Sequence, residues 1–176
     1  KEVTGKRGAR VTVSVSSFVP KPHTPFQWYA QNTTAEINRK QQLLKENIKD
    51  KSISFKYHDA RTSYMEGVFA RGDRRLSKVI MEAWKQGAKF DGWSEYFNLD
   101  TWKEAMEKNN LSIDFYANRE RSYDEVFPWD HIDVGVSKKF LIRENEKAKS
   151  DTVTPDCRHK CNACGINAHD IGRGMC

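Results

Sequence analysis

The stretch that decides the fold is Arg10-Val-Thr-Val-Ser-Val-Ser-Ser-Phe-Val19, which continues directly into Pro20-Lys-Pro-His-Thr-Pro25. Valine alternates with threonine or serine from Val11 to Ser16, and this period of two favours a β-strand. Three prolines then fix φ and remove backbone N–H donors, so neither a helix nor a sheet ladder continues through them. The pattern predicts a strand that feeds a stiff, extended loop.

Beyond this loop the sequence is mainly typical of helix. The capping box at residues 33–36 predicts a helix to about Lys49. Alternating residues predict a second strand over residues 53–57 and a brief strand at residues 113–115. Apolar residues at helical spacing predict four more helices: one ending near Gly72, one from an Asp73 cap to Gly87, one opening at Asp100, and one from Ser137 to about Lys149. Together these elements predict an α+β fold.

Length and composition limit the class of protein. The chain has 176 residues, of which 38% are hydrophobic, so one domain with a real core is expected, alone or with a metal-bound tail. Thirty Lys and Arg against 24 Asp and Glu give a net charge of +6, which suits an anionic partner without requiring one. No apolar run approaches the roughly 18 residues of a membrane span, and we expect a cytoplasmic protein. Because Lys1 is not a methionine and leads straight toward a strand, we also expect the chain to be part of something longer.

The cysteines are confined to the end of the chain. All four lie in the last 20 residues: Cys157, Cys161, Cys164 and Cys176. Thiolates at close spacing favour a zinc ion or an iron–sulfur cluster over calcium or magnesium, and the spacing does not choose between the first two. Disulfides are the alternative, and they require an oxidising compartment.

Two further observations concern this tail. His159 and His169 are alternatives to Cys176 as fourth ligand, although four thiolates already complete a tetrahedral set and solvated histidines explain both residues. The first three cysteines have the C-x3-C-x2-C spacing of the cluster-binding triad in radical S-adenosylmethionine (SAM) enzymes. In those enzymes a long stretch of barrel follows the triad, whereas only 12 residues follow Cys164 here. The tail therefore favours an accessory cluster or a structural zinc.

Several other groups of side chains invite functional roles. Five charged residues have side chains that suit an anionic substrate, although a helix cap with surface arginines is the favoured explanation: Glu66, Arg71, Asp73, Arg74 and Arg75. Three residues have side chains that suit metal ligation or proton transfer, although a structural turn is the favoured explanation: Asp130, His131 and Asp133. Four aromatic residues recur at helical spacing, which favours a core over a base-stacking platform: Trp84, Trp93, Phe97 and Trp102.

Motifs along nearly the whole chain occur in the order found in one known group of enzymes. They are Ser17-Phe-Val-Pro-Lys-Pro-His-Thr-Pro-Phe-Gln-Trp28, Glu66-Gly-Val-Phe-Ala-Arg-Gly-Asp-Arg-Arg75, Phe90-Asp-Gly-Trp93, Pro128-Trp-Asp-His-Ile-Asp-Val-Gly135, Thr154-Pro-Asp-Cys-Arg158 and Cys161-Asn-Ala-Cys-Gly165. The first resembles the end of the catalytic barrel in radical SAM enzymes that also carry a cobalamin-binding domain. The others resemble the C-terminal region of an uncharacterised family in that group.

This resemblance implies a C-terminal fragment whose cobalamin domain, cluster-binding triad and most of the barrel lie upstream of Lys1. The end of the barrel would span residues 1–32, a mainly helical region 33–150, and a metal or iron–sulfur tail 151–176. In the intact enzyme, SAM and a reduced 4Fe–4S cluster would supply a 5′-deoxyadenosyl radical to an unidentified substrate, such as RNA or a ribosomal component. The fragment alone would not be catalytic.

The resemblance also implies a place for the cofactor or substrate. Active sites of α/β barrels lie beyond the C-terminal ends of the strands, so the loop of residues 19–25 would edge the pocket, with Lys21 and His23 as contacts. A rigid connection with its polar groups in water is the structural alternative. A different class of function also fits the sequence: a non-catalytic, basic, zinc-ribbon-like module that binds RNA or a protein.

Overall fold

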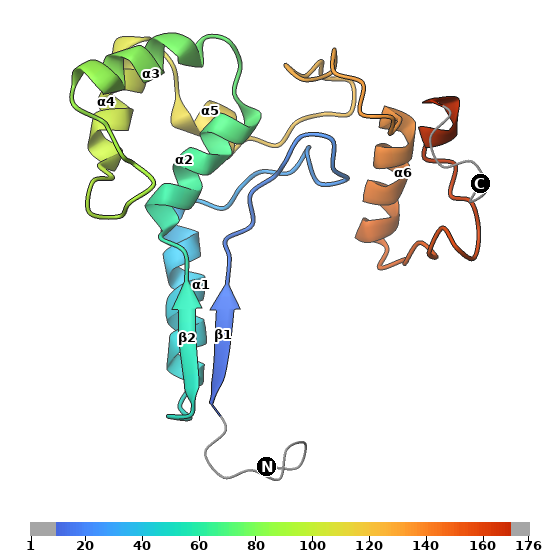
Figure 1. Cartoon of the computed structure of the whole chain (residues 1–176), viewed down its shortest axis with the longest axis horizontal. Helices are drawn as coiled ribbons and strands as arrows, with labels where there is room; N and C mark the ends of the chain where they lie inside the picture. Colours follow the sequence, from blue (N-terminus) through green and yellow to red (C-terminus); the bar gives the residue numbers. More distant parts are fainter. Residues whose placement is uncertain (1–9, 170–176) are drawn as a thin grey trace. The chain divides into compact units, whose positions relative to one another are not determined.

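The computed structural model describes residues 10–169, and Figure 1 shows its elements in chain order. Within these residues the structure mixes helices with a small sheet: β1 (Val11–Val15), α1 (Thr34–Asn47), β2 (Ile53–Tyr57), α2 (Ala60–Arg71), α3 (Leu76–Lys85), α4 (Leu99–Lys108), α5 (Ile113–Ala117), α6 (Lys138–Lys149) and a 3₁₀ helix, η1 (Ile166–His169). The described chain separates into two compact units. The first unit contains residues 10–19 and 31–118, and the second contains residues 20–30 and 119–169.

In the first unit, β1 and β2 form a parallel pair connected through α1 (Figure 1). The register pairs Val11 with Ile53 and Val15 with Tyr57. Both strands lie where the alternating pattern predicts them. The start of α1 is also confirmed, because the Thr33 hydroxyl oxygen accepts a hydrogen bond from the Glu36 backbone N–H at 3.3 Å. A helix between two adjacent parallel strands is the repeating connection of α/β proteins.

Helices α2 to α5 bury one continuous apolar core. Each helix contributes residues at spacings of three and four, which places them on one face. The buried members are Met65, Val68, Leu76, Val79, Ala83, Leu99, Trp102, Ala105, Met106, Ile113, Tyr116 and Ala117. We call this group the helical cluster.

Two local predictions in this region are wrong. Residues 113–117 form the helix α5 rather than a strand, because Ser112 caps the Phe115 N–H at 3.4 Å and Ile113, Tyr116 and Ala117 share one buried face. The N-cap of α3 is Arg75 rather than Asp73. Asp73 acts two residues earlier, where its Oδ1 accepts the Arg75 backbone N–H at 2.9 Å.

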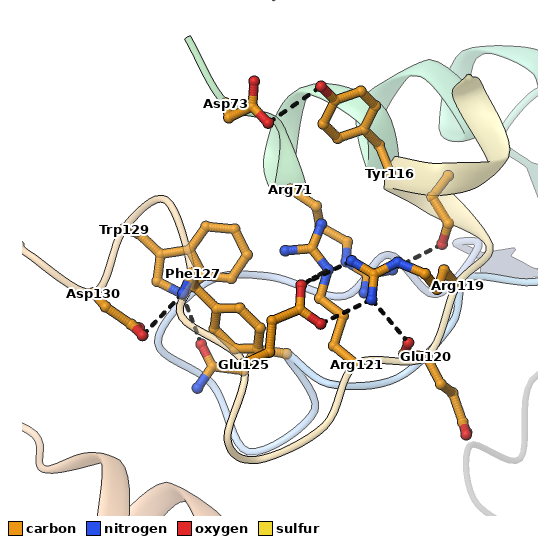
Figure 2. A network of polar contacts seen from close by, with 12 residues as sticks. Arg71, Asp73, Tyr116, Arg119, Glu120, Arg121, Glu125, Phe127, Trp129 and Asp130 are labelled. Carbon is orange, nitrogen blue, oxygen red and sulfur yellow. Dashed lines mark hydrogen bonds and ion pairs between the residues drawn. The ribbon is translucent and has the colours of Figure 1, made fainter. Parts of the chain in front are cut away.

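The second unit packs the proline-rich loop against the C-terminal third of the chain. Its small core consists of Trp28, Phe127, Trp129 and Leu141. The Asn145 side chain on α6 donates to the Pro25 carbonyl at 2.6 Å. Figure 2 shows Arg119 of this unit in a bidentate pair with Glu125, at 2.8 and 2.7 Å. The units thus divide the chain differently from the predicted segments 1–32, 33–150 and 151–176, because residues 20–30 pack with residues that follow α5.

The strand pair is the whole sheet within residues 10–169, so the described residues form no barrel. Its side chains are poorly covered: Val11 is 54% exposed and Tyr57 48%. None of the helices in the described range has both the length and the apolar character that crossing a bilayer requires.

Candidate functional site

A pocket of about 400 Å³ lies in the second unit, between the proline-rich loop, the turn that follows Phe127 and the start of α6. It brings together residues from two of the sequence motifs. Its polar lining consists of His23, Gln27, Asp130, His131, Asp133, Ser137 and Lys138. We call it the histidine pocket.

The buried amide of Gln27 joins the two motifs. Its Oε1 accepts the His23 backbone N–H at 3.0 Å and the Trp129 indole N–H at 2.9 Å. His23 itself has a φ of +56°, in the left-handed region that residues other than glycine seldom adopt. A strained backbone at a pocket wall is typical of a functional position, and the bond to Gln27 helps to hold it.

Asp130 is committed to the turn. Its Oδ2 accepts the Phe127 backbone N–H at 3.0 Å, and the Lys138 ammonium lies 3.5 Å from the same oxygen. Figure 2 shows the Asp130 carboxylate beside this part of the turn. Lys138 also donates to the Glu125 carbonyl at 3.1 Å. The structural explanation therefore accounts for Asp130, which leaves other groups to do chemistry.

Asp133 is similarly engaged at the rim of the histidine pocket. Its Oδ1 accepts the Gly135 N–H at 2.8 Å, and its Oδ2 lies 3.5 Å from Nε2 of His169. In contrast, the imidazoles of His23 and His131 have no hydrogen-bond partner among residues 10–169. Imidazole accepts and releases protons near neutral pH, so these two side chains are the pocket's candidates for proton transfer or substrate hydrogen bonds.

The structure separates the two cofactor-binding residues predicted in the loop. His23 lines the histidine pocket, whereas Lys21 is exposed and does not line it. The Lys21 carbonyl accepts from the Thr24 hydroxyl at 2.8 Å, which stabilises the turn between them. No sequence pattern pointed to Gln27, because a single glutamine among prolines and aromatic residues has no periodicity and matches no motif.

The described part of the cysteine tail does not assemble a metal site. Cys157 and Cys164 carry free thiols, and Cys161 is disulfide-bonded. Within residues 10–169 no three histidine, cysteine or acidic side chains lie close enough to hold a metal. Cys176 lies outside the described residues, so the four-thiolate site stays a prediction. Of the two alternative ligands, His169 faces Asp133 and His159 is exposed.

The tail nevertheless packs closely on the segment that lines the histidine pocket. The Ser137 N–H donates to the Cys164 carbonyl at 2.8 Å, and the Arg143 guanidinium donates to the Asn162 carbonyl. Gly165 has a φ of +111°, and a Cβ there would lie 3.3 Å from the Ser137 nitrogen. Glycine is therefore required where the tail approaches the start of α6.

In the charged motif at residues 66–75, Arg71, Asp73 and Arg75 have structural partners. Arg71 is fully buried and donates to the Ala117 carbonyl at 2.8 Å, so it is structural. Asp73 accepts from the Arg75 guanidinium at 2.6 Å. It also accepts from the Tyr116 hydroxyl at 3.2 Å, as Figure 2 shows. The hydrogen bond from Arg75 is the main cause that lowers the pKa of Asp73 to about 2. Glu66 and Arg74 are exposed.

The prediction that the aromatic residues are core is half wrong. Trp102 is buried, and Phe97 packs against the helical cluster. Trp84 and Trp93 are 55% and 62% exposed. Helical spacing is a poor guide for these two residues. Trp84 does not share the buried face of α3 formed by Leu76, Val79 and Ala83, and Trp93 lies in the loop between α3 and α4.

These features define a mixed α/β protein with a histidine-bearing pocket and a thiol-rich tail. Comparison with known proteins adds little to this class. No family model matches the chain, and no solved structure matches it. An uncharacterised protein of Methanocaldococcus jannaschii is 28% identical over 71 residues. That match covers 40% of this chain and 16% of the archaeal protein, which is too little to assign a family.

Proposed function

We propose that this chain is the C-terminal part of a radical SAM iron–sulfur enzyme, in which β1 and β2 belong to a partial α/β barrel. The observation that carries the proposal is the parallel β1–α1–β2 unit with exposed strands. Parallel strands joined by helices are the repeating unit of such barrels. Parallel sheets occur almost only with both faces covered, so exposure of Val11 and Tyr57 fits a sheet that continues into another part of the enzyme.

The histidine pocket would serve this enzyme as part of its substrate or cofactor site. The loop that carries His23 follows the C-terminal end of β1, the end at which barrel enzymes place their active sites. SAM with a reduced 4Fe–4S cluster, and cobalamin where present, supplies radical chemistry when bound. His23 and His131 would hydrogen-bond the substrate or move its protons, and Gln27 would keep the His23 backbone in place.

The tail would hold an auxiliary cluster or a zinc ion in a reducing cytoplasm. Thiolates are the donors that both groups prefer, and Cys157 and Cys164 carry free thiols. Because no three potential ligands are grouped within residues 10–169, metal binding would have to order the tail, as it does where no large core exists. Cys161, once reduced, would complete the set together with Cys176.

The enzyme class is tested on the intact protein. We expect the coding sequence upstream of Lys1 to contain a C-x3-C-x2-C triad after an early strand. We also expect the purified parent to release 5′-deoxyadenosine from SAM with a reductant. His23→Ala should lower substrate modification, whereas Lys21→Ala, on the same loop but off the pocket, should not. Absence of the triad and of 5′-deoxyadenosine would reject the proposal.

The tail is tested separately on this chain. Anaerobic purification with a thiol reductant, followed by iron, sulfide and zinc analysis, should show a bound metal. Cys161→Ala should remove it, while His159→Ala should leave it unchanged. Metal-free protein under these conditions, with Cys161 again in a disulfide after mild oxidation, would mean that the tail is a disulfide structure.

A further inference from the structure

In the first unit, α3 and the loop between α3 and α4 expose four large aromatic rings. They are Trp84, Phe90, Trp93 and Tyr96, which we call the aromatic platform. Their exposed fractions are 55%, 72%, 62% and 59%. Rings of this size normally provide the largest share of a core, as Trp102 does in α4. The ring centroids of Phe90 and Tyr96 are 6.1 Å apart, and large apolar side chains that lie close together on a surface mark a binding site.

The loop holds these rings in a defined backbone. Trp93 N–H donates to the Phe90 carbonyl at 2.9 Å, and the N–H groups of Tyr96 and Phe97 donate to the Trp93 carbonyl at 3.0 and 3.1 Å. Phe97 anchors the loop on the helical cluster. Phe90, the most exposed of the four rings, has a φ of +60°. This left-handed backbone conformation costs on the order of 1 kcal/mol or more. Because the Phe90 ring is exposed, burial of the ring does not offset that cost.

A lysine lies beside one of the rings. The Lys89 ammonium is 5.8 Å from the centroid of the Trp84 ring and forms no ion pair within 4 Å in the described part of the chain. Lys78 and Lys85 on α3 line a separate pocket with Met81 and Glu82. Two carboxylates, Asp91 and Glu95, lie on the same loop. The Oδ1 atom of Asp91 is buried and accepts no hydrogen bond from residues 10–169. A buried acceptor without a donor is costly, so a ligand that brings an N–H or O–H group is favoured there.

We propose that the aromatic platform binds single-stranded RNA. Bases stack on exposed rings regardless of sequence, and a lysine beside the rings contacts a phosphate. RNA carries the 2′-hydroxyl, a donor that DNA lacks, and Asp91 accepts a hydrogen bond from it. A protein partner fits less well, because lysine is depleted at protein interfaces and Lys89 lies beside the Trp84 ring. The proposal is independent of the radical enzyme assignment.

The test uses the full chain and labelled oligoribonucleotides of about 12 nucleotides, a length that spans a typical stacking site. Fluorescence anisotropy across a salt series gives the affinity and its salt slope. Phe90→Ala and Trp93→Ala should each weaken binding about 5- to 100-fold, the range for loss of one stacked base. Lys89→Gln should reduce the salt slope by about 0.7, the value for one phosphate contact on a single strand.

Tyr57→Ala is the matched control, because it removes an exposed ring, 48% accessible, from β2. It should bind RNA as the unmodified chain does. Asp91→Ala should remove the preference for RNA over DNA of the same sequence, and circular dichroism should show every variant folded. Three results would each overturn the proposal. They are no RNA binding at low salt, RNA binding by Phe90→Ala and Trp93→Ala as tight as by the unmodified chain, or DNA bound by the unmodified chain as tightly as RNA. A chain that binds no RNA but forms a protein complex through these rings would also overturn it.

Discussion

The helical cluster and the strand pair belong to the same unit, yet they differ sharply in how they bury apolar side chains. In the cluster, Val68 and Met106 are 0% and 1% exposed. In the strand pair, Val11 is 54% exposed although its sequence alternates as a half-buried strand should. The helices of the cluster thus bury their apolar faces against one another. The strands have the alternating sequence of a half-buried sheet, but their apolar side chains are poorly covered within residues 10–169. This difference supports the proposal that the strands belong to a larger barrel.

The largest expected effect tests the self-sufficiency of the cluster. Met106→Ala should lower the free energy of unfolding by about 2–5 kcal/mol, because it removes a fully buried side chain and leaves a cavity. Val13→Ala in β1, which deletes a half-buried side chain, should cost under about 1 kcal/mol in this chain. Urea denaturation followed by circular dichroism measures both. Equal losses would show that the strand pair is already part of a complete core and would undercut the barrel assignment.

Much of this contrast could be predicted from sequence. The Val11–Val15 alternation, the Thr33 cap and the apolar spacing of α3 depend on local rules, and the structure confirms all three. The sequence could not reveal that residues 20–30 pack with residues beyond 119, because this pairing rests on long-range contacts such as the one between Asn145 and Pro25. The same limit explains α5, where a short apolar alternation fits either element until tertiary packing decides.

The site was less predictable than the fold. His23 and His131 carried a signal in their motifs, but only the folded chain shows that both line one pocket. Gln27 carried none, since a buried amide is defined by its partners rather than by its neighbours in sequence. From sequence, Asp130 fits either metal ligation or proton transfer or a structural turn. The hydrogen bond that it accepts from the Phe127 N–H favours the structural turn.

A smaller effect tests how tightly the cluster meets the segment that leads into α1. Gly67 on α2 is buried, and a Cβ there would lie 1.9 Å from Oε1 of Gln31, whose Nε2 donates to the Ser63 carbonyl at 2.7 Å. Gly67→Ala should therefore cost about 1–3 kcal/mol through overpacking. Gly92→Ala, where a Cβ meets nothing within 4 Å, should change stability by less than about 0.5 kcal/mol. Thermal melts of both variants give the difference, and a neutral Gly67→Ala would indicate a loosely packed joint.

The smallest effect probes the charge at the N-terminus of α3. The hydrogen bond from Arg75 lowers the pKa of Asp73 to about 2, below the ordinary value of about 3.9. A carboxyl group with a lowered pKa in the folded state stabilises fully above about pH 4, and this contribution disappears as the pH falls toward 2. Asp73→Asn should therefore cost about 1 kcal/mol at pH 6, a value reduced for solvent screening because the Arg75 side chain is 53% exposed.

The pH dependence of that cost separates the charge from the packing of Asp73. Urea titrations between pH 6 and pH 3 should show the gap between Asp73→Asn and the unmodified chain narrowing below about pH 4. Asp100→Asn is the control, because this carboxylate is 79% exposed and its pair with Lys103 should contribute little at any pH. A gap that stays constant would mean that Asp73 acts through its shape and its bond to the Arg75 N–H. The ionisation of Asp73 would then contribute little to the stability of the start of α3.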